Sequence, residues 1–383
     1  MEENSNDNKD NEFNYFTTWG TAIYSTENPP IELSNNSIRQ IIHISAPGQS
    51  IRLKLSNKIG KTNLEIKEIT IADSISQGTG EINTDTLTPL TFNKNNNITI
   101  PPGEEAYSDT INYNLKALSE VAISIYFGST PDNLSGHLGS NTFSFIEKGN
   151  KIHEKAFSKE NKIEHWYFIS SLEINSKSPK KTIVCFGDSI TDGTGSDMDK
   201  HHKYPDYLAI KLNLNKNTTN MGVINKGIYA NKITTEGTER FSYDVLNIKG
   251  VSYIMFLYGV NDINLLNATS SDVISAYKNI IEIAHKNHLF IFAGTILPYG
   301  KFFRWTKERE NYRKEVNNWI RNTKPEHGGF DYVFDYDELL KDPNDETKLF
   351  SIYDSGDGLH PNSQGYQRMV QAIDNLELFT KNF

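Results

Sequence analysis

The sequence is poor in the features that mark several large classes of protein. It has a single cysteine, Cys185, so no disulfide can form within the chain. It has no apolar run long enough to span a bilayer and no cluster of basic residues. Its formal net charge of -9 argues against nucleic-acid binding, because phosphate contacts need a basic face. We therefore expect no membrane span and no nucleic-acid partner.

The sequence also lacks a cluster of cysteine and histidine ligands. No group of cysteines and histidines has the spacing of a structural zinc site. The adjacent pair His201 and His202 is a weak indication of a metal site, and we interpret both as solvated loop residues. Cys185 lies inside an apolar run, which favours a small core residue. The sequence therefore predicts neither a metal nor a cofactor.

Residues 1–13 contain almost nothing that could be buried, and we expect them to be disordered. They also lack the apolar core of a signal peptide. Two interpretations of the compartment stay open. The protein is cytoplasmic, or it is a secreted or cell-envelope protein whose export signal was removed.

Residues 14–176 have the period of half-exposed β-strands. Ile51, Leu53 and Leu55 alternate with polar residues, and the same alternation recurs at 64–71 and 121–127. Turn-forming residues separate these segments, and no helical period of useful length intervenes. Regularly spaced strands without helices predict an antiparallel β-sandwich domain, jelly-roll-like, over residues 14–176.

From residue 177 to residue 383 the pattern changes to apolar runs that alternate with helical periods. The runs read as buried strands are 183–186, 253–257, 289–293 and 332–334. Apolar residues at helical spacing occupy 272–286 and 308–323, and a last helix is expected to begin near Ser363. This alternation predicts an α/β domain of three layers, with a parallel sheet, over residues 177–383.

The segment 181–195 (KTIVCFGDSITDGTG) joins an apolar strand to a polar, glycine-rich stretch at Gly187, Asp188 and Ser189. In parallel sheets, ligands bind beyond the carboxyl ends of the strands. Ser189 therefore stands where a nucleophile would be useful, but Asp188 or Ser189 could instead cap the next helix. The segment alone leaves both interpretations open.

Three further polar clusters follow strands or lie in loops of the same domain: 225–231 (NKGIYAN), 258–262 (YGVND) and 354–361 (DSGDGLHP). With residues 187–189 they resemble the four signature blocks of the SGNH, or GDSL-type, hydrolases, from Lys181 to the C-terminus. The segments 240–244 (RFSYD) and 306–310 (TKERE) are similar to the arylesterase/acylhydrolase subgroup related to rumen xylanase-esterases. In that subgroup a β-rich region precedes the hydrolase domain. The resemblance implies a flavodoxin-like hydrolase fold.

Ester hydrolysis by a serine needs a base to take the hydroxyl proton and donors that stabilise the oxyanion. The resemblance implies that Ser189 is the nucleophile, that His360 is the base, and that Asp357 orients His360. It places the oxyanion donors at the backbone N–H groups of Ser189 and Gly227 and at the side-chain amide of Asn261. Glycine at position 227 would permit close approach of the backbone.

Asp188 also lies beside the expected nucleophile, and we interpret it as structural support for the turn around Ser189. Asp192 and Asp262 receive the same structural interpretation.

An aromatic segment at 298–306 (PYGKFFRWT) follows another strand end. Two interpretations of Tyr229, Phe303 and Trp305 are equally favoured. They line a shallow surface for the acyl group or a sugar, or they pack against the β domain.

Taken together, these features predict a serine esterase that removes short acyl groups, especially acetyl, through an acyl-enzyme. A carbohydrate or a small alcohol is the expected acceptor, and the carbohydrate rests on the subgroup resemblance alone. A lipase or lysophospholipase of the GDSL type is an alternative, weakened by the lack of a long apolar lid. A non-catalytic glycan-binding protein on a hydrolase scaffold is the alternative from another class. Oligomeric state is not predicted.

Overall fold

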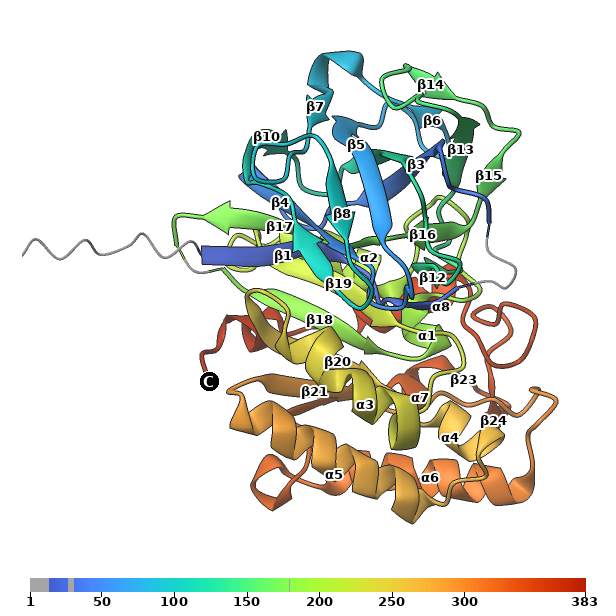
Figure 1. The fold of residues 1–383 in the computed structure, drawn as a ribbon. Helices are drawn as coiled ribbons and strands as arrows, with labels where there is room; N and C mark the ends of the chain where they lie inside the picture. Colours follow the sequence, from blue (N-terminus) through green and yellow to red (C-terminus); the bar gives the residue numbers. More distant parts are fainter. Residues whose placement is uncertain (1–13, 27–30, 179) are drawn as a thin grey trace, which may run out of the picture.

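The computed structural model describes residues 14–26, 31–178 and 180–383, and Figure 1 shows how they are arranged. The segment 1–13, expected to be disordered, lies outside the described residues. Antiparallel sheets form the first part of the chain, and a parallel sheet begins at residue 182. The predicted fold class, an α/β domain with a parallel sheet preceded by a mostly antiparallel β region, is confirmed.

The β region contains two main antiparallel sheets and two small ones. One main sheet has the order β1-β17-β4-β10, with β9 beside β4, and the other has the order β15-β13-β3-β11-β5-β7, with β8 beside β5. The small sheets are β16-β12-β2 and β14-β6. The strands are β1 (Asn14–Gly20), β2 (Tyr24–Ser25), β3 (Asn36–His43), β4 (Gly48–Ser56), β5 (Leu64–Asp73), β6 (Gly80–Glu81), β7 (Thr88–Pro89), β8 (Ile98–Ile100), β9 (Glu105–Tyr107), β10 (Ile111–Leu115), β11 (Glu120–Phe127), β12 (Ser135–Leu138), β13 (Ser144–Lys148), β14 (Ala156–Phe157), β15 (Lys162–Ile163), β16 (His165–Tyr167) and β17 (Ile169–Ser176).

The alternation seen in the sequence becomes the core of this region. Leu53 and Leu55 of β4 and Ile123 of β11 are fully buried in one cluster that both main sheets supply. Segment 165–169 is divided between two strands. Phe168 has a φ of 62°, so β16 ends before it and β17 begins after it.

The parallel sheet has the order β19-β18-β20-β21-β22. Its strands are β18 (Thr182–Gly187), β19 (Gly222–Gly227), β20 (Val251–Leu257), β21 (Phe290–Gly294) and β22 (Tyr332–Phe334), and a separate hairpin joins β23 (Lys341–Asp342) to β24 (Asp345–Leu349). The strand order reverses at β18, and ligands of such sheets bind beyond the carboxyl ends of the strands at that point. β19 was not expected, and Asn225 to Gly227 lie inside this strand rather than after one.

Helices flank the parallel sheet, and α5 and α6 form the layer furthest from the β region (Figure 1). The predicted helices are confirmed in α5, α6 and α8. A capping box between Thr269 and Asp272 begins α5. No helix among the described residues combines the length and the apolar character that a membrane crossing requires. The helical segments are α1 (Ser189–Asp192), α2 (Tyr204–Asn213), α3 (Thr238–Phe241), α4 (Val260–Leu265), α5 (Ser270–Lys286), α6 (Lys307–Asn322), α7 (Tyr336–Leu340) and α8 (Ser363–Gln371), with π-helical turns at Ile233–Gly237 and Ser242–Leu246 and 3-10 turns at Thr84–Thr86, Pro325–His327 and Leu376–Thr380.

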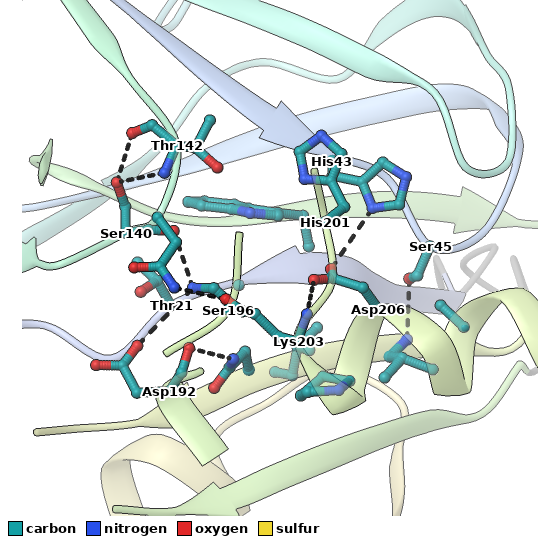
Figure 2. A pocket seen from close by; sticks show the side chains of 18 of the residues that line it. Thr21, His43, Ser45, Ser140, Thr142, Asp192, Ser196, His201, Lys203 and Asp206 are labelled. Carbon is teal, nitrogen blue, oxygen red and sulfur yellow. Dashed lines mark hydrogen bonds and ion pairs between the residues drawn. The ribbon is translucent and has the colours of Figure 1, made fainter. Parts of the chain in front are cut away.

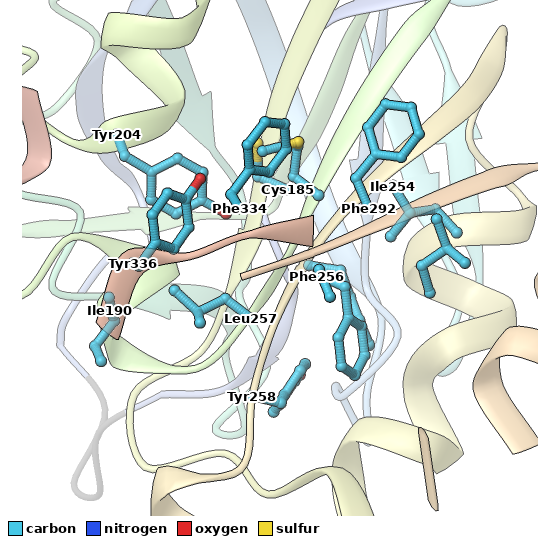
Figure 3. Close-up of a cluster of buried hydrophobic side chains, with 14 of the residues drawn as sticks. Cys185, Ile190, Tyr204, Ile254, Phe256, Leu257, Tyr258, Phe292, Phe334 and Tyr336 are labelled. Atoms are coloured by element: carbon cyan, nitrogen blue, oxygen red, sulfur yellow. The ribbon is translucent and has the colours of Figure 1, made fainter. Parts of the chain in front are cut away.

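The core of the α/β domain is rich in aromatic side chains, and Figure 3 shows part of it. Cys185 of β18 lies in this cluster and is fully buried, as the sequence predicted. Burial raises the pKa of the Cys185 thiol far above its ordinary value, so this thiol is an apolar packing element.

The two halves of the chain are in direct contact. β1 packs beside β19, and the Thr17 N–H donates to the Thr182 hydroxyl at 3.0 Å. A Cβ atom at Gly222 would lie 1.9 Å from the Thr17 carbonyl oxygen, so only glycine allows this approach. The Val223 N–H donates to the Ser45 hydroxyl at 2.9 Å.

Candidate active site

Ser189 is the first residue of α1 and lies two residues beyond the carboxyl end of β18. Asp188 is the N-cap, and its Oδ1 accepts the Ile190 N–H at 3.0 Å. The two interpretations of this stretch therefore apply to different residues, because Asp188 caps the helix and leaves the Ser189 hydroxyl available. Burial raises the pKa of the Asp188 carboxyl to about 7.

The Ser189 hydroxyl meets a histidine and a carboxylate that are distant in the sequence. Its Oγ lies 2.8 Å from His360 Nε2, and His360 Nδ1 lies 2.5 Å from Asp357 Oδ2. Because the Asp357 carboxylate can only accept, His360 carries its proton on Nδ1 and presents Nε2 as an acceptor for the serine hydroxyl. The structure thus brings together the three residues of the expected triad.

Asp357 is held by the loop that also carries His360. Its Oδ1 accepts the backbone N–H groups of Leu359 and His360, each at 2.9 Å. Partial burial opposes the charge of this carboxyl, but the hydrogen bonds from His360 more than offset it and hold the pKa well below its usual range. The pair is therefore oriented locally, whatever the rest of the fold does.

Two of the three expected oxyanion donors have a hydrogen that is not donated to another described residue. Ser189 occupies the first position of α1, and its N–H has no acceptor among the described residues. Asn261 lies near the start of α4, after Gly259 in the left-handed region at a φ of 114°. One amide hydrogen of Asn261 is donated to the Asn231 carbonyl at 3.2 Å, which orients the side chain and leaves the second hydrogen.

The third expected donor, the Gly227 N–H, is already engaged. It donates to Asn225 Oδ1 at 2.9 Å, while Asn225 Nδ2 donates to the Thr191 carbonyl at 2.8 Å. A Cβ atom at Gly227 would lie 2.1 Å from the Asp192 backbone nitrogen. The structure therefore contradicts the expectation that Gly227 offers a free donor. Its lack of a side chain serves the close packing of β19 against α1 instead.

The aromatic residues expected around the site have three different environments. Tyr229 is 61% exposed and stacks on His360 with ring centroids 6.3 Å apart. Phe303 is 81% exposed. Trp305 is half-buried against the hydrolase core, and its indole N–H donates to Glu310 at 3.4 Å. This packing differs from one of the two interpretations that the sequence left open, in which Trp305 lies against the β domain.

Arg240 is a site residue that the sequence did not identify as functional. Its guanidinium donates to the carbonyls of Gly187 at 2.9 Å and Lys226 at 2.8 Å, and also to the Asn231 amide oxygen and the Tyr258 hydroxyl. These partners stand at the ends of β18, β19 and β20 and in the loop after β19. One side chain therefore joins the three strand ends that present Ser189, Gly227 and Asn261.

The charge of Arg240 is balanced inside the protein. Its guanidinium is 2.7 Å from Asp244, which also lies 3.3 Å from the Lys226 ammonium. The spacing of four residues between Arg240 and Asp244 in a helical stretch was the sequence signal for this ion pair.

The β region also contacts the helix of Ser189. His137 of β12 faces two acceptors, the Ala22 carbonyl and Asp192 Oδ1, each at 2.9 Å from a ring nitrogen. The contact between His137 and Asp192 joins β12 to the end of α1, and both side chains are buried. Asn141 donates to the Gly193 carbonyl at 2.8 Å beside it. Asp192 and Asp262 thus have structural surroundings, as expected, and Asp262 accepts three hydrogen bonds from the turn at Ile233–Gly237.

Residues 185–368 match the model of the GDSL-like Lipase/Acylhydrolase family. A search of curated proteins finds no match. Among solved structures, the chain is similar to the lipase/acylhydrolase from Enterococcus faecalis (23% identity, TM-score 0.40, 50% of this chain and 93% of that chain). It is also similar to a GDSL-like lipase from Bacteroides thetaiotaomicron VPI-5482 (20% identity, TM-score 0.40, 50% and 85%) and to an acetyl xylan esterase (20% identity, TM-score 0.40, 50% and 97%).

Proposed function

We propose that Ser189 is the nucleophile of a carboxylic ester hydrolase. Residues 185–368 match the GDSL-like Lipase/Acylhydrolase family, whose members hydrolyse esters. His360 then acts as the general base and Asp357 orients it. The observation that carries the proposal is the continuous chain from Ser189 Oγ to His360 Nε2 at 2.8 Å and from His360 Nδ1 to Asp357 Oδ2 at 2.5 Å. Nucleophile, base and orienting carboxylate within hydrogen-bond reach are the signature of an activated serine.

In this mechanism the Ser189 oxygen attacks the ester carbonyl carbon while its proton passes to His360 Nε2. Asp357 stabilises the imidazolium that results. The tetrahedral intermediate expels the alcohol, whose oxygen takes the proton from His360, and an acyl-enzyme remains on Ser189. Water then attacks the acyl carbon with His360 again as base, which releases the carboxylic acid and restores the serine.

The Ser189 N–H and the free amide hydrogen of Asn261 are the proposed oxyanion donors. Removal of one such donor lowers turnover by roughly 100- to 1,000-fold in comparable sites. We expect Asn261→Ala to lower kcat by a factor in this range. Asn264→Ala, in the same helix, is the matched control, because the Asn264 amide donates to the Val260 carbonyl within the helix. Equal losses in both variants would contradict the role of Asn261.

For the substrate, we propose a short acyl group, with acetyl first, on a carbohydrate or small alcohol. Ser189 is 2% exposed and His360 is 5% exposed, which favours a small group at the reacting atoms. The side chains of Tyr229 and Phe303 are instead largely exposed, which suits contact with the alcohol part of the ester. The variants Phe303→Ala and Trp305→Ala distinguish substrate contact from packing. Phe303→Ala is expected to raise KM because Phe303 is exposed, whereas Trp305→Ala is not. An unchanged KM in folded Phe303→Ala would show that Phe303 does not contact the substrate.

Labelling with a serine-directed fluorophosphonate tests the nucleophile. The intact protein is expected to label and to hydrolyse 4-nitrophenyl acetate, whereas Ser189→Ala should do neither. Ser252→Ala, on β20, is the control that should retain both activities. If the folded, intact protein fails to label, the non-catalytic glycan-binding scaffold becomes the better interpretation.

A series of 4-nitrophenyl esters of increasing acyl length, together with acetylated oligosaccharides, tests the substrate class. We expect kcat/KM to be highest for acetate and to fall with chain length. A maximum at octanoate or longer would favour the lipase alternative. Acid quenching during turnover, followed by peptide mass analysis, should show an acetyl group on the Ser189 peptide.

A further inference from the structure

Three potential metal ligands from both halves of the chain meet at the domain interface, in the pocket drawn in Figure 2. His43 ends β3 of the β region, His201 lies in the loop before α2, and Asp206 stands in the first turn of α2. One ligand atom of each lies within 4.8 Å of the ligand atoms of the other two. None of these side chains belongs to the proposed hydrolytic machinery.

The spacing of the ligand atoms suits a metal ion better than direct hydrogen bonds. His43 Nδ1 lies 3.6 Å from Asp206 Oδ1, which is too long for a hydrogen bond. Ligand atoms about 2.0–2.1 Å from a tetrahedral zinc ion are roughly 3.3 Å from one another. His43 and Asp206 are therefore close to the separation of two ligands that share one ion.

The groups around the cluster orient the ligands as they do in metal sites. His201 Nε2 lies 2.5 Å from Glu120 Oε1, which leaves Nδ1 of His201 as the nitrogen available to an ion. Asp206 Oδ2 accepts the Lys203 N–H at 3.1 Å, which leaves Oδ1 toward His43. A metal-bound histidine usually gives its other N–H to a carboxylate or a carbonyl, and a metal-bound carboxylate is usually hydrogen-bonded as well.

The two imidazole rings lie face to face. The centroids of His43 and His201 are 4.1 Å apart and the planes differ by 5°. Because the lone pair of an imidazole nitrogen lies in the ring plane, both rings must rotate out of this stack to share one ion with Asp206.

The loop that carries His201 is neither solvated nor relaxed. The His201 side chain is only 11% exposed, so its interpretation as a solvated loop residue is wrong. Asp199 and His201 have φ values of 57° and 53°, in the left-handed region that non-glycine residues seldom adopt. The surrounding structure holds this backbone in place and directs His201 into the interface.

We propose that His43, His201 and Asp206 bind a transition-metal ion of the zinc class, with solvent completing the coordination. Two imidazoles and one carboxylate suit Zn²⁺, Co²⁺ or Ni²⁺, whereas Ca²⁺ and Mg²⁺ prefer oxygen ligands. Asp206 and Glu120 also place two carboxylates beside the histidines, which favours a divalent cation. As His43 comes from one domain and the other two ligands from the second, the ion would join the domains.

Cobalt binding by the full chain tests the proposal. Protein stripped with EDTA and returned to metal-free buffer is titrated with Co²⁺, and equilibrium dialysis measures the stoichiometry. We expect about one ion per chain, visible absorption bands typical of histidine-bound cobalt, and their loss when Zn²⁺ is added. His43→Gln and His201→Gln should each weaken binding at least about 10-fold. His202→Gln is the matched control, because His202 is adjacent and outside the cluster.

Thermal unfolding supplies a second readout. Zn²⁺ should raise the Tm of the wild-type protein and of His202→Gln but not that of His43→Gln. His43→Gln is expected to keep the metal-free Tm. Failure to bind Co²⁺ at millimolar concentration, or full binding by both His43→Gln and His201→Gln, would overturn the proposal. The result is independent of the nucleophile, because metal binding is measured rather than hydrolysis.

Discussion

Arg240 offers the sharpest test of how the site is held, because it joins three strand ends and, in the proposed mechanism, contacts no substrate. Arg240→Met removes the charge and the hydrogen bonds but keeps most of the aliphatic stem. The carbonyls of Gly187 and Lys226 then lose a donor, and Asp244 loses one of its two cationic partners. We expect a less stable protein in which Ser189 is less well placed.

The size of the loss follows from burial. Removal of one partner from a buried ion pair costs roughly 3–5 kcal/mol. Each carbonyl left unpaired would add about 1–3 kcal/mol if the effects were additive. Lys226 remains 3.3 Å from Asp244 and offsets part of this cost. We therefore expect Arg240→Met to lower the free energy of unfolding by about 3–5 kcal/mol, a large share of the roughly 5–15 kcal/mol typical of native proteins.

Urea unfolding and ester hydrolysis measure the two consequences separately. Under conditions where the variant stays folded, kcat should fall by about 10- to 100-fold, because small misplacements of a nucleophile are costly. Arg240→Lys should recover part of the stability through Asp244 and little of the activity, since a single ammonium cannot reach all the strand ends. Arg368→Met, on the surface of α8, should change stability by no more than about 0.5 kcal/mol.

An Arg240→Met protein with stability within about 1 kcal/mol of wild type and full kcat would refute the bridging role of Arg240. Complete recovery of kcat in Arg240→Lys would also refute it. That result would mean that the charge, rather than the bridging of strand ends, is what matters.

Three further predictions concern single positions. Gly227→Ala should lower both Tm and kcat, because the new Cβ would lie 2.1 Å from the Asp192 nitrogen, and an unchanged Tm would show that α1 yields freely. Asp357→Asn should lower kcat/KM by roughly 1,000- to 10,000-fold with little change in the urea midpoint, whereas a change below 10-fold would separate His360 from Asp357. Asp188 has a pKa raised from 3.8 to about 7 in the folded protein, so its contribution to stability is complete below pH 3.8 and is lost as the pH rises through about 7. Asp188→Asn should remove that part of the pH dependence, at most about 4 kcal/mol, and an identical slope of stability against pH in both proteins would count against it.

The fold class was predictable because it depends on patterns of short range. The alternation at residues 51–55 indicates a strand with one buried face, and the apolar run of β18 indicates a strand buried on both faces. The helices α5 and α6 follow from an apolar stripe on one face. The missed strand, β19, has only two apolar residues, Val223 and Ile224, between a glycine and polar residues, so its sequence carries little strand signal.

The sequence by itself also determined the part of the site that is local. Asp357 and His360 are three residues apart, and a turn suffices to bring them together. The N-cap role of Asp188 likewise depends on its neighbours alone. Ser189 and His360 are 171 residues apart, and here the resemblance to known hydrolases supplied what spacing could not.

Only the tertiary structure decided which polar groups are already occupied. It engaged the Gly227 N–H with Asn225, placed Arg240 between three strand ends, and set His43 beside His201 across the domain interface. The physical reason is that periodicity specifies which face of an element is buried, whereas a hydrogen bond or a metal site depends on which atoms of remote elements meet there. Contacts between remote elements are properties of the packed fold and produce no periodic pattern along the sequence.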